Sequence, residues 1–87
     1  MNAVVDNYPE AVKHFEGAAA AAARAGDSLF QARKLIALAQ ALVRAEHSEQ
    51  AWKRAEAARR LAMGIGWAEG KREAEQVLAL LESRQKP

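Results

Sequence analysis

The segment "AVKHFEGAA" at residues 11–19 returns forty residues later as "AWKRAEAAR" at residues 51–59. The small and apolar positions of both segments are spaced by four and then three residues, which places them on one face of a helix. These positions are Ala11, Phe15 and Ala18 in the first segment and Ala51, Ala55 and Ala58 in the second. The shared spacing indicates an architectural repeat of packed helices.

A second helical pattern recurs at nearly the same distance along the chain. Residues 35–42 carry apolar side chains at positions i, i+3, i+4 and i+7, the stripe of a helix that faces a core. Residues 74–81 repeat this stripe thirty-nine positions later. The two stripes are Leu35, Leu38, Ala39 and Leu42, and then Ala74, Val77, Leu78 and Leu81.

The composition predicts one small all-α domain over residues 1–87. Twenty-two of the 87 residues are alanine, whereas Leu, Ile, Val and Phe together number seventeen. Small side chains let helix backbones approach closely, so the core is expected to be thin. Two prolines, five glycines and few β-branched residues favour helix along most of the chain.

Start and stop signals predict four antiparallel helices, at about residues 8–25, 28–46, 48–63 and 67–84. Asn7 is the expected cap of the first helix, with Glu10 as its capping-box partner. Asp27 or Ser28 is the expected cap of the second helix, and Ser48 of the third. Gly26 and the "GIG" segment at residues 64–66 are expected to end helices.

The charge pattern is typical of a solvated helical surface. Thirteen basic and eleven acidic residues give a net charge of +2, which is too small to require an anionic partner. Opposite charges recur at i, i+4, which predicts ion pairs along the helices. These are Glu49 with Lys53, Glu56 with Arg60, Lys71 with Glu75 and Glu82 with Lys86.

No cysteine is present, and the start of the chain lacks the basic and apolar regions of a signal peptide. No apolar run approaches the ~20 residues of a membrane span. A cytoplasmic location without membrane contact is therefore expected.

The helix patterns resemble the tetratricopeptide repeat, whose first helix carries large, large, small and large residues and whose second carries Ala, aromatic and Ala. Leu35, Leu38, Ala39 and Leu42 match the first pattern, and Ala11, Phe15 and Ala18 match the second best. The period of 39 or 40 residues is longer than the usual 34. It is similar to the helical repeats in the sensor arms of large bacterial transcriptional activators. The resemblance covers about residues 8–84 and implies about two helical hairpins.

In this family the first helix of each pair lines a concave binding face, and the resemblance therefore implies a partner-binding surface here. It would bind a peptide or partner helix that has an apolar anchor and a carboxylate, since arginine pairs with carboxylates bidentately. The residues that map to this face are Arg33, Ile36, Gln40, Val43 and Arg44 on the second helix, and Arg72, Glu75, Ala79 and Glu82 on the fourth. They are expected to lie off the core stripe and to be exposed.

The order of the helices also predicts self-association. Repeat arrays bury each unit against its neighbours, and this chain ends on a helix of the first type. Its last helix is expected to expose Leu80 or Leu81, which would favour a homodimer. The alternative is a closed four-helix bundle that leaves no face to pair.

A nucleic-acid-binding accessory protein is one alternative function, because Trp52 lies beside Lys53 and Arg54, with Arg59 and Arg60 further along. Glu49 and Glu56 neutralise this strip, so nucleic acid is not the expected partner. A small helical regulator that occludes its partner, similar to an antitoxin or anti-activator, is the other alternative.

Catalysis is not expected, and neither a metal nor another cofactor is. His14 and His47 are the only histidines, and neither has acidic or thiol residues at a ligand spacing. Ser28 and Ser48 are accounted for as caps. The sequence thus predicts an interaction or adaptor module rather than an enzyme.

Overall fold

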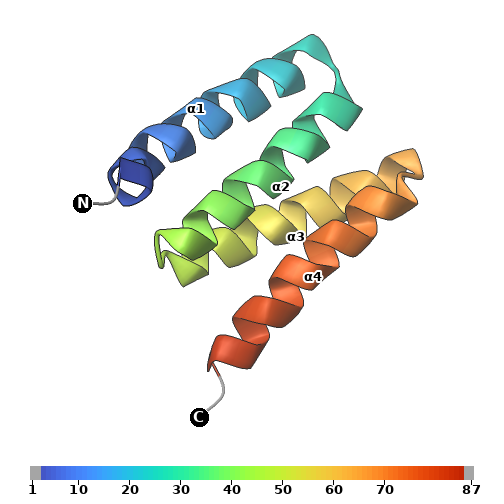
Figure 1. Cartoon of the computed structure of the whole chain (residues 1–87). Coiled ribbons are helices and arrows are strands. Elements are labelled where there is room, and N and C mark those ends of the chain that lie inside the picture. The colour runs from blue at the N-terminus through green and yellow to red at the C-terminus, as the bar shows by residue number, and fades with distance from the viewer. Residues whose placement is uncertain (1–2, 86–87) are drawn as a thin grey trace.

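Four α-helices make up the computed structural model, which describes the backbone of residues 3–85 and the side chains of residues 9–84 (Figure 1). They are α1 (Ala3–Ala25), α2 (Ser28–Arg44), α3 (Ser48–Ile65) and α4 (Ala68–Gln85). No strand occurs among these residues, so the predicted all-α class with four helices is confirmed.

The three connections between helices have the same backbone structure. Gly26, Glu46 and Gly66 each adopt a positive φ of 64–74°, and successive members of this set are 20 residues apart. The residue after each of them donates its N–H to a carbonyl five positions back: Asp27 to Ala22, His47 to Leu42 and Trp67 to Ala62. This is the Schellman pattern of helix ends. One helix and its turn therefore occupy 20 residues, which accounts for the forty-residue recurrence in the sequence.

Two of the predicted caps are wrong. α1 begins at Ala3, so Asn7 lies inside the helix rather than at its N-cap, and Pro9 is its seventh residue. Ser48 is the first residue of α3; the N-cap is His47, which makes no side-chain hydrogen bond. The predicted cap at Asp27 is confirmed, because its carboxylate accepts a hydrogen bond of 3.1 Å from the backbone N–H of Phe30.

Two predicted helix ends also differ from the structure. α2 stops at Arg44, two residues early, because Glu46 adopts a left-handed conformation that glycine usually supplies. α3 continues to Ile65, since the positive φ of this segment falls on Gly66 and not on Gly64.

Successive helices pack as antiparallel neighbours, and α2 also contacts α4. Figure 1 shows α1 and α4 on opposite flanks, with α2 and α3 between them. The turns α1–α2 and α3–α4 lie at one end of the molecule, and the turn α2–α3 lies at the other. The Cα atoms span 39 × 29 × 18 Å.

The core follows the predicted stripes closely. The buried residues of α3 are all alanines: Ala51, Ala55, Ala58 and Ala62 are each 0% exposed. Leu38, Leu42 and Leu81 are the largest side chains that are fully enclosed. On α1 the predicted positions Ala11, Phe15 and Ala18 are only half-buried, because α1 packs on one flank of the molecule.

Trp67 packs over Gly70 at the α3–α4 junction. A Cβ atom built on Gly70 would overlap the six-membered ring of the Trp67 indole. Trp67 itself is half-buried and contacts the core. Gly70 is therefore required by space rather than by its backbone conformation.

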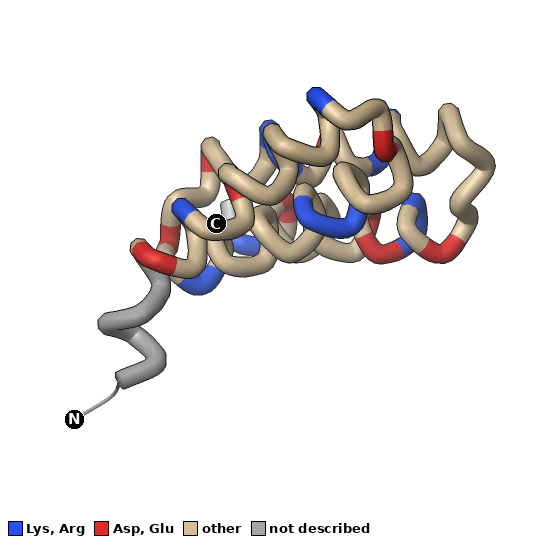
Figure 2. The backbone as a smooth tube through the Cα atoms, turned by 90° about the horizontal axis from the view of Figure 1, so that it is seen from above, with Lys and Arg blue, Asp and Glu red and all other residues tan. Residues whose placement is uncertain are grey.

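Basic and acidic residues are interspersed along the helices (Figure 2). The predicted pairs Glu56–Arg60 and Lys71–Glu75 are present at 3.5 and 3.3 Å. The predicted pair of Glu49 with Lys53 does not form, and the side chain of Lys86 lies outside the described residues. Within residues 3–85, no helix combines the length and the apolar character that crossing a bilayer requires.

Candidate functional site

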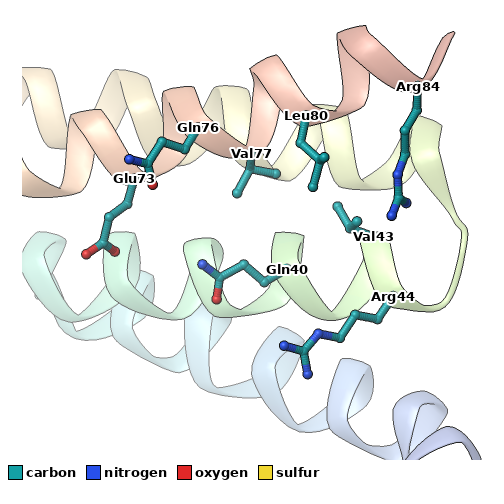
Figure 3. A pocket seen from close by; sticks show the side chains of 8 residues that line it. All are labelled: Gln40, Val43, Arg44, Glu73, Gln76, Val77, Leu80 and Arg84. Atoms are coloured by element: carbon teal, nitrogen blue, oxygen red, sulfur yellow. The ribbon is translucent and has the colours of Figure 1, made fainter.

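A groove of about 410 Å³ lies between α2 and α4 on one side of their contact (Figure 3). Its apolar surface comes from Val43 on α2 and from Val77 and Leu80 on α4, and Figure 3 shows Leu80 and Val43 pointing toward each other. The remaining lining residues are polar: Gln40, Arg44, Glu73, Gln76 and Arg84. The groove thus has an apolar middle and a polar rim.

Helical spacing places the lining residues of α4 on one face. Residues 73, 76, 77, 80 and 84 follow the intervals i, i+3, i+4, i+7 and i+11. Val77 also belongs to the core, whereas Leu80 is 46% exposed. The groove face of α4 therefore borders the core stripe, and Leu80 carries most of its accessible apolar surface.

The opposite ends of the groove carry opposite charges. Glu73 lies at one end, and Arg84 and Arg44 stem from the other (Figure 3). None of these three side chains forms an ion pair with another side chain among residues 9–84. They are exposed and available to charged groups of a ligand.

On α2, the structure brings three of the five predicted site residues into the groove: Gln40, Val43 and Arg44. Arg33 is exposed but lies outside the groove lining. Ile36 was expected to be exposed, and this is wrong, because it is 4% exposed and belongs to the core. Val43 is also nearly buried, at 7%, so it can present only its edge to a ligand.

On α4, none of the predicted residues lines the groove. Arg72, Glu75, Ala79 and Glu82 are exposed but lie outside the groove lining, and Glu75 pairs with Lys71. The groove-lining residues Glu73, Gln76 and Leu80 each precede a buried position by one residue. The sequence marks the core stripe but not which of its two flanks faces α2.

The sequence predicts that the last helix exposes either Leu80 or Leu81, and in the structure Leu80 is the exposed residue. Leu80 is 46% exposed, whereas Leu81 is 0% exposed and lies in the core. The two positions differ by one residue, about 100° around the helix axis, which moves a side chain from the core to the groove.

A second hollow of about 290 Å³ lies between α1 and α2 and is lined in part by Phe15, Ala37 and Ala41. Gln40 and Arg44 line this hollow as well as the α2–α4 groove. These two polar side chains of α2 therefore lie between the two hollows and line both of them.

The Trp52 strip is engaged in contacts within the protein. Arg54 forms an ion pair of 3.4 Å with Glu16, which joins α3 to α1, and Arg60 pairs with Glu56. Trp52 is half-buried and packs against the core. This strip offers less free charge and less aromatic surface than the sequence pattern indicates.

The histidines lie apart from each other and from acidic clusters. His14 packs edge-on against Phe15 with ring centroids 5.7 Å apart, and His47 occupies the N-cap of α3. In the described part of the chain, no three His, Cys, Asp or Glu side chains come together in a way that could hold a metal ion.

Comparison of the chain with protein-family models, with curated proteins and with solved structures finds no match. The assignment of function therefore rests on the α2–α4 groove.

Proposed function

We propose that this chain is a protein-interaction module, built from tetratricopeptide-like hairpins, that holds an amphipathic helix or peptide in the α2–α4 groove. The observation that carries the proposal is the half-exposed Leu80 between two charged ends of opposite sign. An exposed leucine flanked by unpaired charges suits a ligand that is apolar in the middle and charged at its ends.

The charges define the chemistry of the ligand. A carboxylate of the ligand would pair with Arg84 and Arg44, because guanidinium groups bind carboxylates through two parallel hydrogen bonds. A basic group of the ligand would lie near Glu73. The ligand would therefore bind in one direction along the groove.

The groove can be tested with peptides selected for binding from a library of random helix-forming sequences. Selected peptides should contact Leu80, and burying the remaining half of a leucine side chain contributes about 1 kcal/mol. Leu80→Ala should then weaken binding roughly fivefold. Leu80→Asp should weaken binding much further, because it places a hydrated carboxylate against the apolar part of the ligand and this carboxylate competes for Arg84, four residues along α4.

Matched arginine variants separate the groove from the rest of the surface. Arg44→Glu and Arg84→Glu should each weaken peptide binding roughly tenfold or more. Arg33→Glu on α2 and Arg72→Glu on α4 make the same charge change outside the groove and should alter affinity by less than about twofold. A library that yields no binder, or binders that tolerate Leu80→Asp, would contradict the proposal.

Salt dependence distinguishes this function from nucleic-acid binding. A peptide anchored on Leu80 should bind with a shallow dependence on salt concentration. A nucleic-acid complex should weaken steeply, by about one power of salt concentration per phosphate contact.

A further inference from the structure

The order of residues along the groove face of α4 is complementary to its own reverse. From its N-terminal end, this face presents Glu73, then Gln76, the edge of Val77 and Leu80, and then Arg84. When a second α4 is turned antiparallel about a point midway between residues 78 and 79, Glu73 faces Arg84 and Val77 faces Leu80. Both charge pairs form at once, because the same 11 residues, about 16 Å of helix, separate Glu73 from Arg84 in each copy.

This is the arrangement that a twofold-symmetric interface requires. In such an interface, residue i of one copy contacts residue j of the other, and residue j contacts residue i. The parallel arrangement would place Glu73 against Glu73 and Arg84 against Arg84, which like-charge repulsion disfavours.

We propose that two copies of this chain form an antiparallel dimer in which α4 of each copy lies in the α2–α4 groove of the other. α2 strengthens the charge pairing, because Arg44 stems from the same end of the groove as Arg84 (Figure 3). Glu73 of the second copy therefore meets two arginines. Leu80, the exposed apolar side chain of the groove, becomes buried at the centre of the interface.

The dimer concerns the same groove as the proposed function and specifies how it is regulated. A foreign helix or peptide must compete with α4 of the second copy, so dilution or dissociation of the dimer exposes the binding site. The dimer itself does not depend on the existence of such a partner, and its test contains none.

The oligomeric state is measured by sedimentation equilibrium over a range of protein concentrations. The wild-type average mass should rise with concentration from 9.5 kDa toward twice this value. Glu73→Arg and Arg84→Glu should each remain monomeric over the same range, because each places like charges together at both ends of the interface. The dissociation constant should increase roughly tenfold or more in either variant.

Mixing these two variants provides the decisive measurement. A Glu73→Arg chain carries arginine at both ends of the face, and an Arg84→Glu chain carries glutamate at both ends. The equimolar mixture should therefore form a dimer of one chain of each kind, with a dissociation constant close to that of the wild type. Recovery of dimer in the mixture also establishes that both variants are folded.

Two control variants make the same charge changes at exposed positions of α4 that do not line the groove. Arg72→Glu and Glu82→Arg should dimerise as the wild type does. A wild-type chain that stays monomeric at all concentrations would overturn the proposal. So would a dimer that persists in both charge variants, or a mixture that fails to recover it while circular dichroism shows both variants to be helical.

Discussion

Gly70→Ala should destabilise this protein, although alanine is a better helix former than glycine. Gly70 lies in the first turn of α4 beneath the indole ring of Trp67. A methyl group at this position would overlap three atoms of that ring, Cδ2, Cε3 and Cζ3, well inside van der Waals contact. Because the methyl group and the ring cannot occupy the same space, the indole must move away from α4.

The size of the effect follows from the burial of Trp67. A tryptophan side chain buries about 200 Å² when fully enclosed. Since Trp67 is half-buried, displacing its ring would expose about 100 Å² of apolar surface. At about 25 cal/mol per Å², complete displacement of the ring would cost about 2.5 kcal/mol. The gain from replacing glycine in a helix offsets at most about 1 kcal/mol. The net loss should be about 1–2 kcal/mol, a decrease in melting temperature of roughly 5–15 °C.

The free energy of unfolding is measured by urea denaturation followed by circular dichroism. Gly17→Ala provides the matched control, because Gly17 lies in the middle of α1 and a Cβ atom there has no neighbour within 4 Å. This control should stabilise the protein by about 0.5–1 kcal/mol. A double-mutant cycle with Trp67→Ala isolates the contact: once the indole is removed, Gly70→Ala should no longer destabilise.

Two results would refute this reasoning. If Gly70→Ala stabilised the protein as much as Gly17→Ala does, the indole would not lie over Gly70. If Gly70→Ala remained destabilising in the Trp67→Ala background, its cost would come from a source other than the ring.

Three further changes test local features of the fold by thermal or urea denaturation. Asp27→Ala removes the carboxylate that caps α2 at Phe30 and should cost about 1 kcal/mol, whereas Asp27→Asn should cost only a few tenths. Glu46→Gly places glycine at a positive φ of 64° and should stabilise the protein by about 1 kcal/mol; a loss of stability would argue against the left-handed conformation. Arg54→Gln breaks the half-exposed ion pair with Glu16 and should cost less than about 1 kcal/mol, with the difference shrinking in 1 M salt.

Local chemistry accounts for the features that the sequence predicts correctly. Apolar spacing identifies the buried stripes on α2, α3 and α4, because residues three and four apart share one face of any helix. Asp27 is one of the two predicted caps of α2, with Ser28, because a short carboxylate can reach the free N–H groups of the next turn, and the structure selects Asp27. Gly26 and the segment at residues 64–66 are predicted to end helices because glycine enters the left-handed region without strain, and Gly26 and Gly66 do so.

Some local signals pointed to the wrong residue. Ser48 has the chemistry of a cap, yet the turn geometry makes His47 the N-cap. The identity of Glu46 does not indicate a positive φ. Glu46 adopts one because this turn has the same backbone structure as the turns at Gly26 and Gly66. In both cases the closure of the turn between α2 and α3 outweighs the preference of the single residue.

The sequence by itself determined the helices, their order and the central core stripes of α2, α3 and α4, since these depend on residue spacing within a few turns of one helix. The tertiary structure alone decided that Ile36 is buried, that Glu16 meets Arg54, and that Glu73, Leu80 and Arg84 line the groove in place of Arg72, Glu75 and Glu82. Periodicity fixes which residues share a face. Periodicity does not fix which side of that face meets a neighbouring helix. This depends on how each helix is rotated and tilted against the others, which is set by contacts between residues far apart in the chain.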